Sequence, residues 1–156
     1  MVFTDEPISI NGWEPKNYGG DYRGNAALTE AFTASINSVA VKVSEAVGYD
    51  AVIATARDLG ITTPIGSNAS LALGTSEVSL LEMTARLSGQ SLGRVAGLGA
   101  KPPGGCEPPG DSGAWKLAEP ESMRELLSSV VSGGTGQGVQ LPIAILTGTS
   151  QEYRDA

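Results

Sequence analysis

The sequence predicts a mixed α/β (α+β) fold, in which a helical lobe is followed by the beginning of a sheet. Apolar residues recur at helical spacing in four segments before residue 86, and again after Pro120. The apolar run at residues 141–146 contains two isoleucines and has the length of a strand. Between these parts, residues 86–118 are rich in glycine and proline, and their apolar residues recur at neither the spacing of a helix nor that of a strand. We expect this divergent stretch to be a long loop within the domain.

Four helices are predicted before residue 86: residues 26–35, residues 37–47, residues 50–59 and a helix that starts near Ser79. Gly48 and Gly60 stand where the second and third should end. Ser79 and Glu82 are three residues apart, which is the spacing of a capping box at a helix N-terminus.

A further helix is predicted to begin at Pro120, because proline suits the first position of a helix. Gly133 and Gly134 follow its last turn. Its apolar stripe consists of Met123, Leu126, Leu127, Val130 and Val131.

The stretch before the first helix, residues 6–24, is predicted to be a loop. It contains turn signals at Asn11-Gly12, Glu14-Pro15 and Gly19-Gly20. Trp13 and Tyr18 lie in this loop, where they could line a cleft or pin the loop to the body. We favour pinning.

Composition excludes several classes of function. The net charge of −7 argues against a nucleic-acid partner, which requires a basic face. The chain has no histidine and one cysteine, Cys106, so it holds no Ser-His-Asp triad, no Cys-His dyad and no Cys₄ zinc site. We expect no metal and no cofactor. No apolar run approaches the roughly 20 residues that a membrane-spanning helix needs, so we expect no membrane segment.

Two polar clusters are candidates for chemistry: Ser35-Ile36-Asn37, at a junction between predicted helices, and Thr147-Gly148-Thr149-Ser150, at the end of the predicted strand. Taken alone, each is typical of ordinary structure. A Ser-x-Asn triplet at the start of a helix is often a helix cap, and a Thr/Gly/Ser run is often a turn.

The surrounding residues change this interpretation, because they resemble the transpeptidase domain of bifunctional (class A) penicillin-binding proteins. The resemblance covers roughly residues 5–85 and 119–156 in the family's order, and it predicts that residues 1–156 form a partial transpeptidase domain. The stretches that carry it are residues 11–20, 22–24, 28–32, 35–41, 60–61, 70–78, 130–131, 134–136, 147–151 and 153–156.

The resemblance implies part of the serine β-lactamase/penicillin-binding transpeptidase fold, mostly its helical lobe. It also implies acyl transfer on the D-Ala-D-Ala end of peptidoglycan stem peptides, which β-lactams block. Ser35 would relay a proton toward the leaving amine, and Asn37 would orient the substrate amide. Thr147, Gly148, Thr149 and Ser150 would bind substrate, and the N–H of Thr149 would help form an oxyanion hole.

Two departures bear on activity. The family's nucleophile motif, Ser-x-x-Lys, occurs nowhere in the 156 residues, and Leu146 stands where the family's Lys-Thr-Gly motif has lysine. We therefore expect a piece that begins inside the domain and is inactive by itself. The alternatives are a non-catalytic helical binding or interaction module that retains part of the ligand cleft, and a chain that does not fold stably alone. By resemblance, its location is the periplasmic side of the bacterial inner membrane, and its partners are stem peptides and β-lactams.

Overall fold

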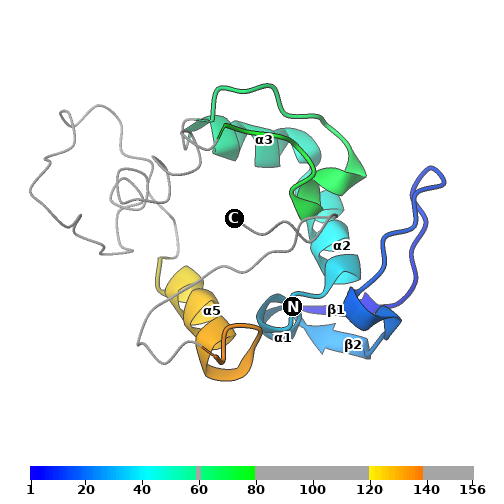
Figure 1. Cartoon of the computed structure of the whole chain (residues 1–156), viewed down its shortest axis with the longest axis vertical. Helices are drawn as coiled ribbons and strands as arrows, with labels where there is room; N and C mark the ends of the chain where they lie inside the picture. The colour runs from blue at the N-terminus through cyan, green and yellow to red at the C-terminus, as the bar shows by residue number, and fades with distance from the viewer. Residues whose placement is uncertain (59–60, 80–119, 139–156) are drawn as a thin grey trace, which may run out of the picture. The chain divides into compact units, whose positions relative to one another are not determined.

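The computed structural model describes residues 1–58, 61–79 and 120–138. The chain divides into two compact units, one formed by Met1–Lys42 with Ser122–Ala156 and the other by Val43–Glu121. Helices and a small antiparallel sheet occur together (Figure 1), which confirms the predicted mixed fold class. The predictions for Gly60, for the helix after Ser79, for the loop at residues 86–118 and for the strand at residues 141–146 lie outside the described residues.

The sheet of the first unit was not predicted. Strand β1 (Val2–Asp5) pairs with the antiparallel strand β2 (Gly24–Ala27), with Val2 opposite Ala27 and Asp5 opposite Gly24. Side chains alternate between the two faces of a strand, so Phe3 and Asp5 point to the same side. Asp5 is buried there and Phe3 is half-buried, whereas Val2 and Thr4 are exposed.

The prediction of a helix at residues 26–35 is wrong about where the helix begins. Ala26 and Ala27 belong to β2, and helix α1 covers Leu28–Thr33. Alanine is a good helix former, but here pairing with β1 overrides that local preference. The partner strand lies more than twenty residues away, so the helical spacing of the segment carried no sign of it.

Helix α2 (Asn37–Val47) has the predicted bounds, and Gly48 follows it with a φ of +93°. Its buried residues Val39 and Val41 join Ala26 of β2, Ala31 of α1 and Ile36 in a small apolar core. The burial of this core holds the sheet, α1 and the first part of α2 together.

Helix α5 (Pro120–Gly133) also confirms its prediction. Leu127 and Val130, from the predicted apolar stripe, are buried in the first unit. The hydroxyls of Ser129 and Thr33 are hydrogen-bonded at 2.5 Å, which places α5 against the C-terminal end of α1.

The second unit contains helix α3 (Tyr49–Asp58), whose predicted apolar residues Val52, Ile53 and Ala56 are half-buried. The guanidinium of Arg57 donates to the carbonyls of Ile61 and Thr63, both at 2.8 Å, and so holds the chain after the helix. The short 3₁₀-helix η2 (Ala69–Leu73) was not predicted.

The loop at residues 6–24 contains the predicted turns. Ile10 and Trp13 exchange two backbone hydrogen bonds across Asn11-Gly12, whose φ angles of 52° and 83° are those of a type I′ turn. The short 3₁₀-helix η1 (Tyr18–Gly20) follows. Trp13 is half-buried, in line with pinning, but Tyr18 is 88% exposed and cannot pin the loop.

None of the helices in the described ranges has the length and apolar character needed to cross a membrane.

Candidate functional site

Ser35 lies at the junction of α1 and α2, in a backbone conformation that glycine usually takes. Its φ is +55°. Its N–H donates to the carbonyl of Phe32 at 3.1 Å, and the N–H of Ile36 donates to the carbonyl of Ala31 at 2.9 Å. These two bonds form a Schellman motif, and the buried pair Ala31 and Ile36 supplies the apolar contact that accompanies it. The motif ends α1 and turns the chain directly into α2.

The side chain of Ser35 is free to meet a ligand. It is exposed, and its hydroxyl makes no hydrogen bond with another described residue. The capping alternative does not hold, because the carbonyl of Ile36 accepts the N–H of Ala40 at 3.0 Å and Ile36 is therefore the N-cap of α2. A serine in the left-handed region costs about 1 kcal/mol relative to glycine, and such strain is common at functional sites.

Asn37 is the first helical residue of α2 and is half-buried. Its side-chain amide donates to the carbonyl of Lys16 in the loop, at 2.8 Å. Its side-chain oxygen has no partner among the described residues. The structure therefore brings Ser35 and Asn37 together at one helix junction, with one polar group of each left unused.

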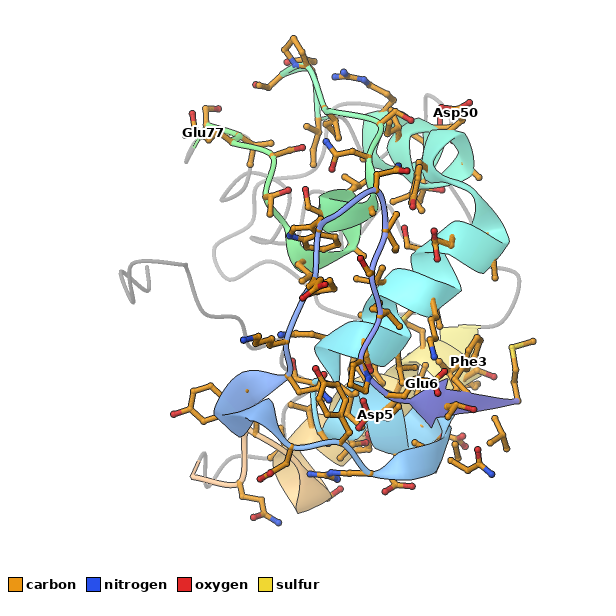
Figure 2. The ribbon with its side chains drawn as sticks, turned by 90° about the vertical axis from the view of Figure 1, so that its right-hand side faces the viewer. Phe3, Asp5, Glu6, Asp50 and Glu77 are labelled. Carbon is orange, nitrogen blue, oxygen red and sulfur yellow. The ribbon has the colours of Figure 1, made fainter. Side chains whose placement is uncertain are left out.

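The carboxylate of Asp5 accepts three hydrogen bonds, two from the loop at residues 6–24 and one from α2. Asp5 is only 1% exposed, and Figure 2 labels it at the end of β1. One oxygen accepts from the hydroxyl of Ser38 in α2 and from the amide of Asn17, the latter at 2.7 Å. The other accepts from the N–H of Arg23 at 2.9 Å. This buried cluster joins β1, the loop and the first turn of α2, where the helix dipole also favours a negative charge.

The charge of Asp5 is stabilised by these contacts. Burial alone would raise the pKa of its carboxyl group, but the hydrogen bonds from Ser38, Asn17 and Arg23, with the positive charge of Arg23, outweigh burial and hold the pKa below its ordinary value of 3.8. Asp5 is therefore an anion at neutral pH.

A second polar contact ties α2 to the end of β1. The ammonium of Lys42 donates to the carbonyl of Thr4 at 2.6 Å and to the carboxylate of Glu6 at 2.8 Å. Through these two bonds, Lys42 stabilises the contact between α2 and β1.

The predicted substrate-binding residues Thr147, Gly148, Thr149 and Ser150 lie outside the described residues, as does Leu146. Their roles remain predictions. No group of histidine, cysteine and acidic residues suited to holding a metal occurs in the part of the chain that the structure describes.

Sequence reasoning found Ser35 and Asn37 but missed Asp5, Asn17 and Ser38. Asp5 ends a strand that was not predicted, and it stands 33 residues from Ser38 in sequence. The one local signal was a short hydroxyl residue in the first turn of a predicted helix, where its polar group must find a partner.

Comparisons with known proteins were made over the whole chain. No family model matches it. Penicillin-binding protein 1A of Aquifex aeolicus is 38% identical over 80 residues, which are 51% of this chain and 11% of that protein. Penicillin-binding protein 1A of Neisseria meningitidis is 26% identical over 181 aligned positions, which cover 99% of this chain and 23% of that protein.

Among solved structures, penicillin-binding protein 1A from Haemophilus influenzae matches with a TM-score of 0.54 and 27% identity, over 65% of this chain and 16% of that one. The chain is related to the class A penicillin-binding proteins through part of their transpeptidase domain. The D,D-transpeptidase domain of a peptidoglycan glycosyltransferase from Eggerthella lenta shares the fold of this chain, with a TM-score of 0.67 and 17% identity over 90% of this chain and 45% of that one.

The resemblance read from the sequence is thus confirmed, and so is the partial penicillin-binding fold. The chain spans about a tenth to a quarter of the length of the curated penicillin-binding proteins it matches.

Proposed function

We propose that the chain forms the Ser-x-Asn wall of a peptidoglycan D,D-transpeptidase site and binds the D-Ala-D-Ala end of stem peptides, and β-lactams that mimic it, without reacting with them. The observation that carries this proposal is the junction itself. Ser35, whose hydroxyl has no hydrogen-bond partner among the described residues, stands in a strained left-handed conformation next to Asn37, whose amide is held by Lys16. The family relationship supplies the class of ligand.

The absence of reaction follows from the chemistry of acyl transfer. A covalent step needs a nucleophile that attacks the substrate carbonyl and a base that takes its proton. The family uses the serine and lysine of Ser-x-x-Lys for these tasks, and the 156 residues contain no such motif. We place the site on the periplasmic side of the inner membrane, where the family's substrate lies.

We expect the purified chain to form no covalent adduct with a fluorescent penicillin. After incubation, the protein is denatured and separated by electrophoresis, and in-gel fluorescence is measured. A full-length class A penicillin-binding protein serves as the positive control. A fluorescent band from this chain that survives denaturation would contradict the claim that it lacks a nucleophile.

Reversible binding tests whether the junction recognises the D-Ala-D-Ala end at all. The chain is titrated with a peptide ending in D-Ala-D-Ala and with the same peptide ending in L-Ala-L-Ala, and amide NMR shifts are followed. We expect shifts near the α1–α2 junction with the first peptide only. The absence of any shift at millimolar peptide would remove the proposal.

Two substitutions at Ser35 should separate its role in binding from its cost in stability. Ser35→Ala and Ser35→Gly both remove the hydroxyl, so both should weaken peptide binding by about tenfold. Glycine tolerates a φ of +55° and alanine does not. Ser35→Gly should therefore be more stable than Ser35→Ala by about 0.5–1 kcal/mol in urea unfolding. Equal stability of the two variants would show that the turn is not strained.

A further inference from the structure

Asn17 uses both the amino group and the oxygen of its side chain. The amino group donates to the carboxylate of Asp5 at 2.7 Å and to the carbonyl of Asp21 at 3.0 Å. The oxygen accepts the N–H of Ser38 at 3.1 Å. A reversed amide would set its oxygen against a carboxylate and its amino group against an N–H, so one orientation is enforced.

Asn17 thereby supplies the cap that α2 lacks. The N-cap of the helix is Ile36, whose side chain has no acceptor, and the oxygen of Asn17 takes the N–H that a capping side chain would take. The start of α2 is therefore positioned by a residue of the loop rather than by its own sequence.

The contact between loop and helix consists of two hydrogen bonds, and α2 donates both of them. Asn17 accepts from the backbone of Ser38, and its neighbour Lys16 accepts at its carbonyl from the side chain of Asn37. Two consecutive loop residues are thus bonded to two consecutive helix residues. Any shift of Asn17 moves the carbonyl that orients the amide of Asn37.

This contact is anchored in the interior by Asp5, which is 1% exposed and also accepts from the hydroxyl of the fully buried Ser38. A charged acceptor makes these bonds strong and directional. The chain of contacts runs from the buried carboxylate through Asn17 to the loop backbone and the exposed motif.

We propose that Asn17, held by Asp5, is the positioning residue that presents the side chains of Ser35 and Asn37 to a D-Ala-D-Ala peptide. The proposal rests on the function proposed above, in that the ligand is the one assigned to the junction. Asn17 touches no ligand; it acts through Lys16 and Ser38.

The test compares Asn17→Ala and Asn17→Asp with Asn25→Ala in the full chain. Asn25 is an exposed asparagine of the same unit, whose side-chain oxygen accepts a hydrogen bond of 3.3 Å from the hydroxyl of Thr4. Two properties are measured by NMR: the side-chain amide resonances of Asn37, and the affinity for a peptide ending in D-Ala-D-Ala. We expect Asn17→Ala to move the Asn37 resonances and lower the affinity about tenfold or more, while Asn25→Ala changes neither.

Asn17→Asp supplies a rescue that a purely structural role would not show. At neutral pH the new carboxylate faces that of Asp5, and the two repel each other. As the pH falls, one proton shared by the pair replaces the amide donor, because adjacent carboxylates raise each other's affinity for a proton. Affinity and the Asn37 resonances should return toward those of the parent at the same pH, with far-UV circular dichroism unchanged throughout.

The outcomes separate this inference from the proposed function. If the parent binds no peptide, the proposed function fails, and the Asn37 resonances alone then decide the positioning role. Unmoved resonances in Asn17→Ala would overturn the inference. So would unfolding of both Asn17 variants at every pH, since Asn17 would then serve the whole fold and not the motif.

Discussion

Replacing Asp5 with alanine is expected to lower the free energy of unfolding by about 3 kcal/mol or more. The substitution removes one acceptor and leaves three donors without it: the hydroxyl of Ser38, the amide of Asn17 and the N–H of Arg23. Ser38 is fully buried, so water cannot replace the lost bond there. The measurement is urea unfolding followed by far-UV circular dichroism at neutral pH.

Asp21→Ala is the matched control. Asp21 is an exposed aspartate of the same unit, and its contact with Asn17 uses its backbone carbonyl, which the substitution keeps. Asp21→Ala removes the same charge as Asp5→Ala. We expect it to change the free energy of unfolding by no more than about 0.5 kcal/mol. Equal losses in the two variants would show that net charge, and not the buried cluster, sets the effect.

The same cluster predicts the direction of acid sensitivity. The pKa of Asp5 is lower in the folded chain than its ordinary value of 3.8, so the unfolded chain binds the proton first as the pH falls. The stabilisation is therefore complete above the unfolded pKa and is lost as the pH falls through the folded pKa. Measured from about pH 6 to about pH 2.5, the stability gap between the parent and Asp5→Ala should narrow. A constant gap would contradict this assignment.

Gly134→Ala is the second substitution with a large expected effect. A Cβ at this position would overlap the carbonyl oxygen of Thr33 and lie 3.0 Å from the Cα of Val130. Both are backbone atoms, so neither can rotate away, and α5 would have to move off the end of α1. We expect a loss of about 2–3 kcal/mol in urea unfolding. Because Thr33 lies two residues before Ser35, peptide affinity should fall as well.

The neighbouring Gly133 is the control, since a Cβ there would meet nothing within 4 Å. Gly133→Ala adds the same methyl group at the last residue of α5, where alanine is the better helix former, so stability should be unchanged or slightly higher. A similar loss in both variants would mean that α5 does not approach Thr33 as the structure shows.

Local sequence predicted the helices that carry their own boundaries. α2 has an apolar face and is followed by Gly48, and α5 begins at Pro120, so their periodicity and end signals needed no partner. The Asn11-Gly12 turn was predictable for the same reason. β1 and β2 were not, because strands of four residues acquire their hydrogen bonds from segments far away in sequence.

The candidate site likewise contains some residues that the sequence predicts and others that only the structure identifies. Ser35 and Asn37 were recognised because a motif and its flanking residues are contiguous in sequence. The side chain of Asn17 has three bonding partners among the described residues, Asp5, Asp21 and Ser38, and two of them are distant in sequence. Its role depends on how the loop at residues 6–24 closes onto β1 and α2. The Ser-x-Asn triplet contains no information about that closure.

By itself, the sequence determined the resemblance to class A penicillin-binding proteins, the Ser-x-Asn motif and the absence of Ser-x-x-Lys from the 156 residues, because these are properties of residue identity and order. Only the tertiary structure decided that Ser35 occupies a strained turn, with its hydroxyl exposed, and that a buried carboxylate holds the loop which orients Asn37. The physical reason is that a buried polar group must find its partners in space, whatever their distance along the chain.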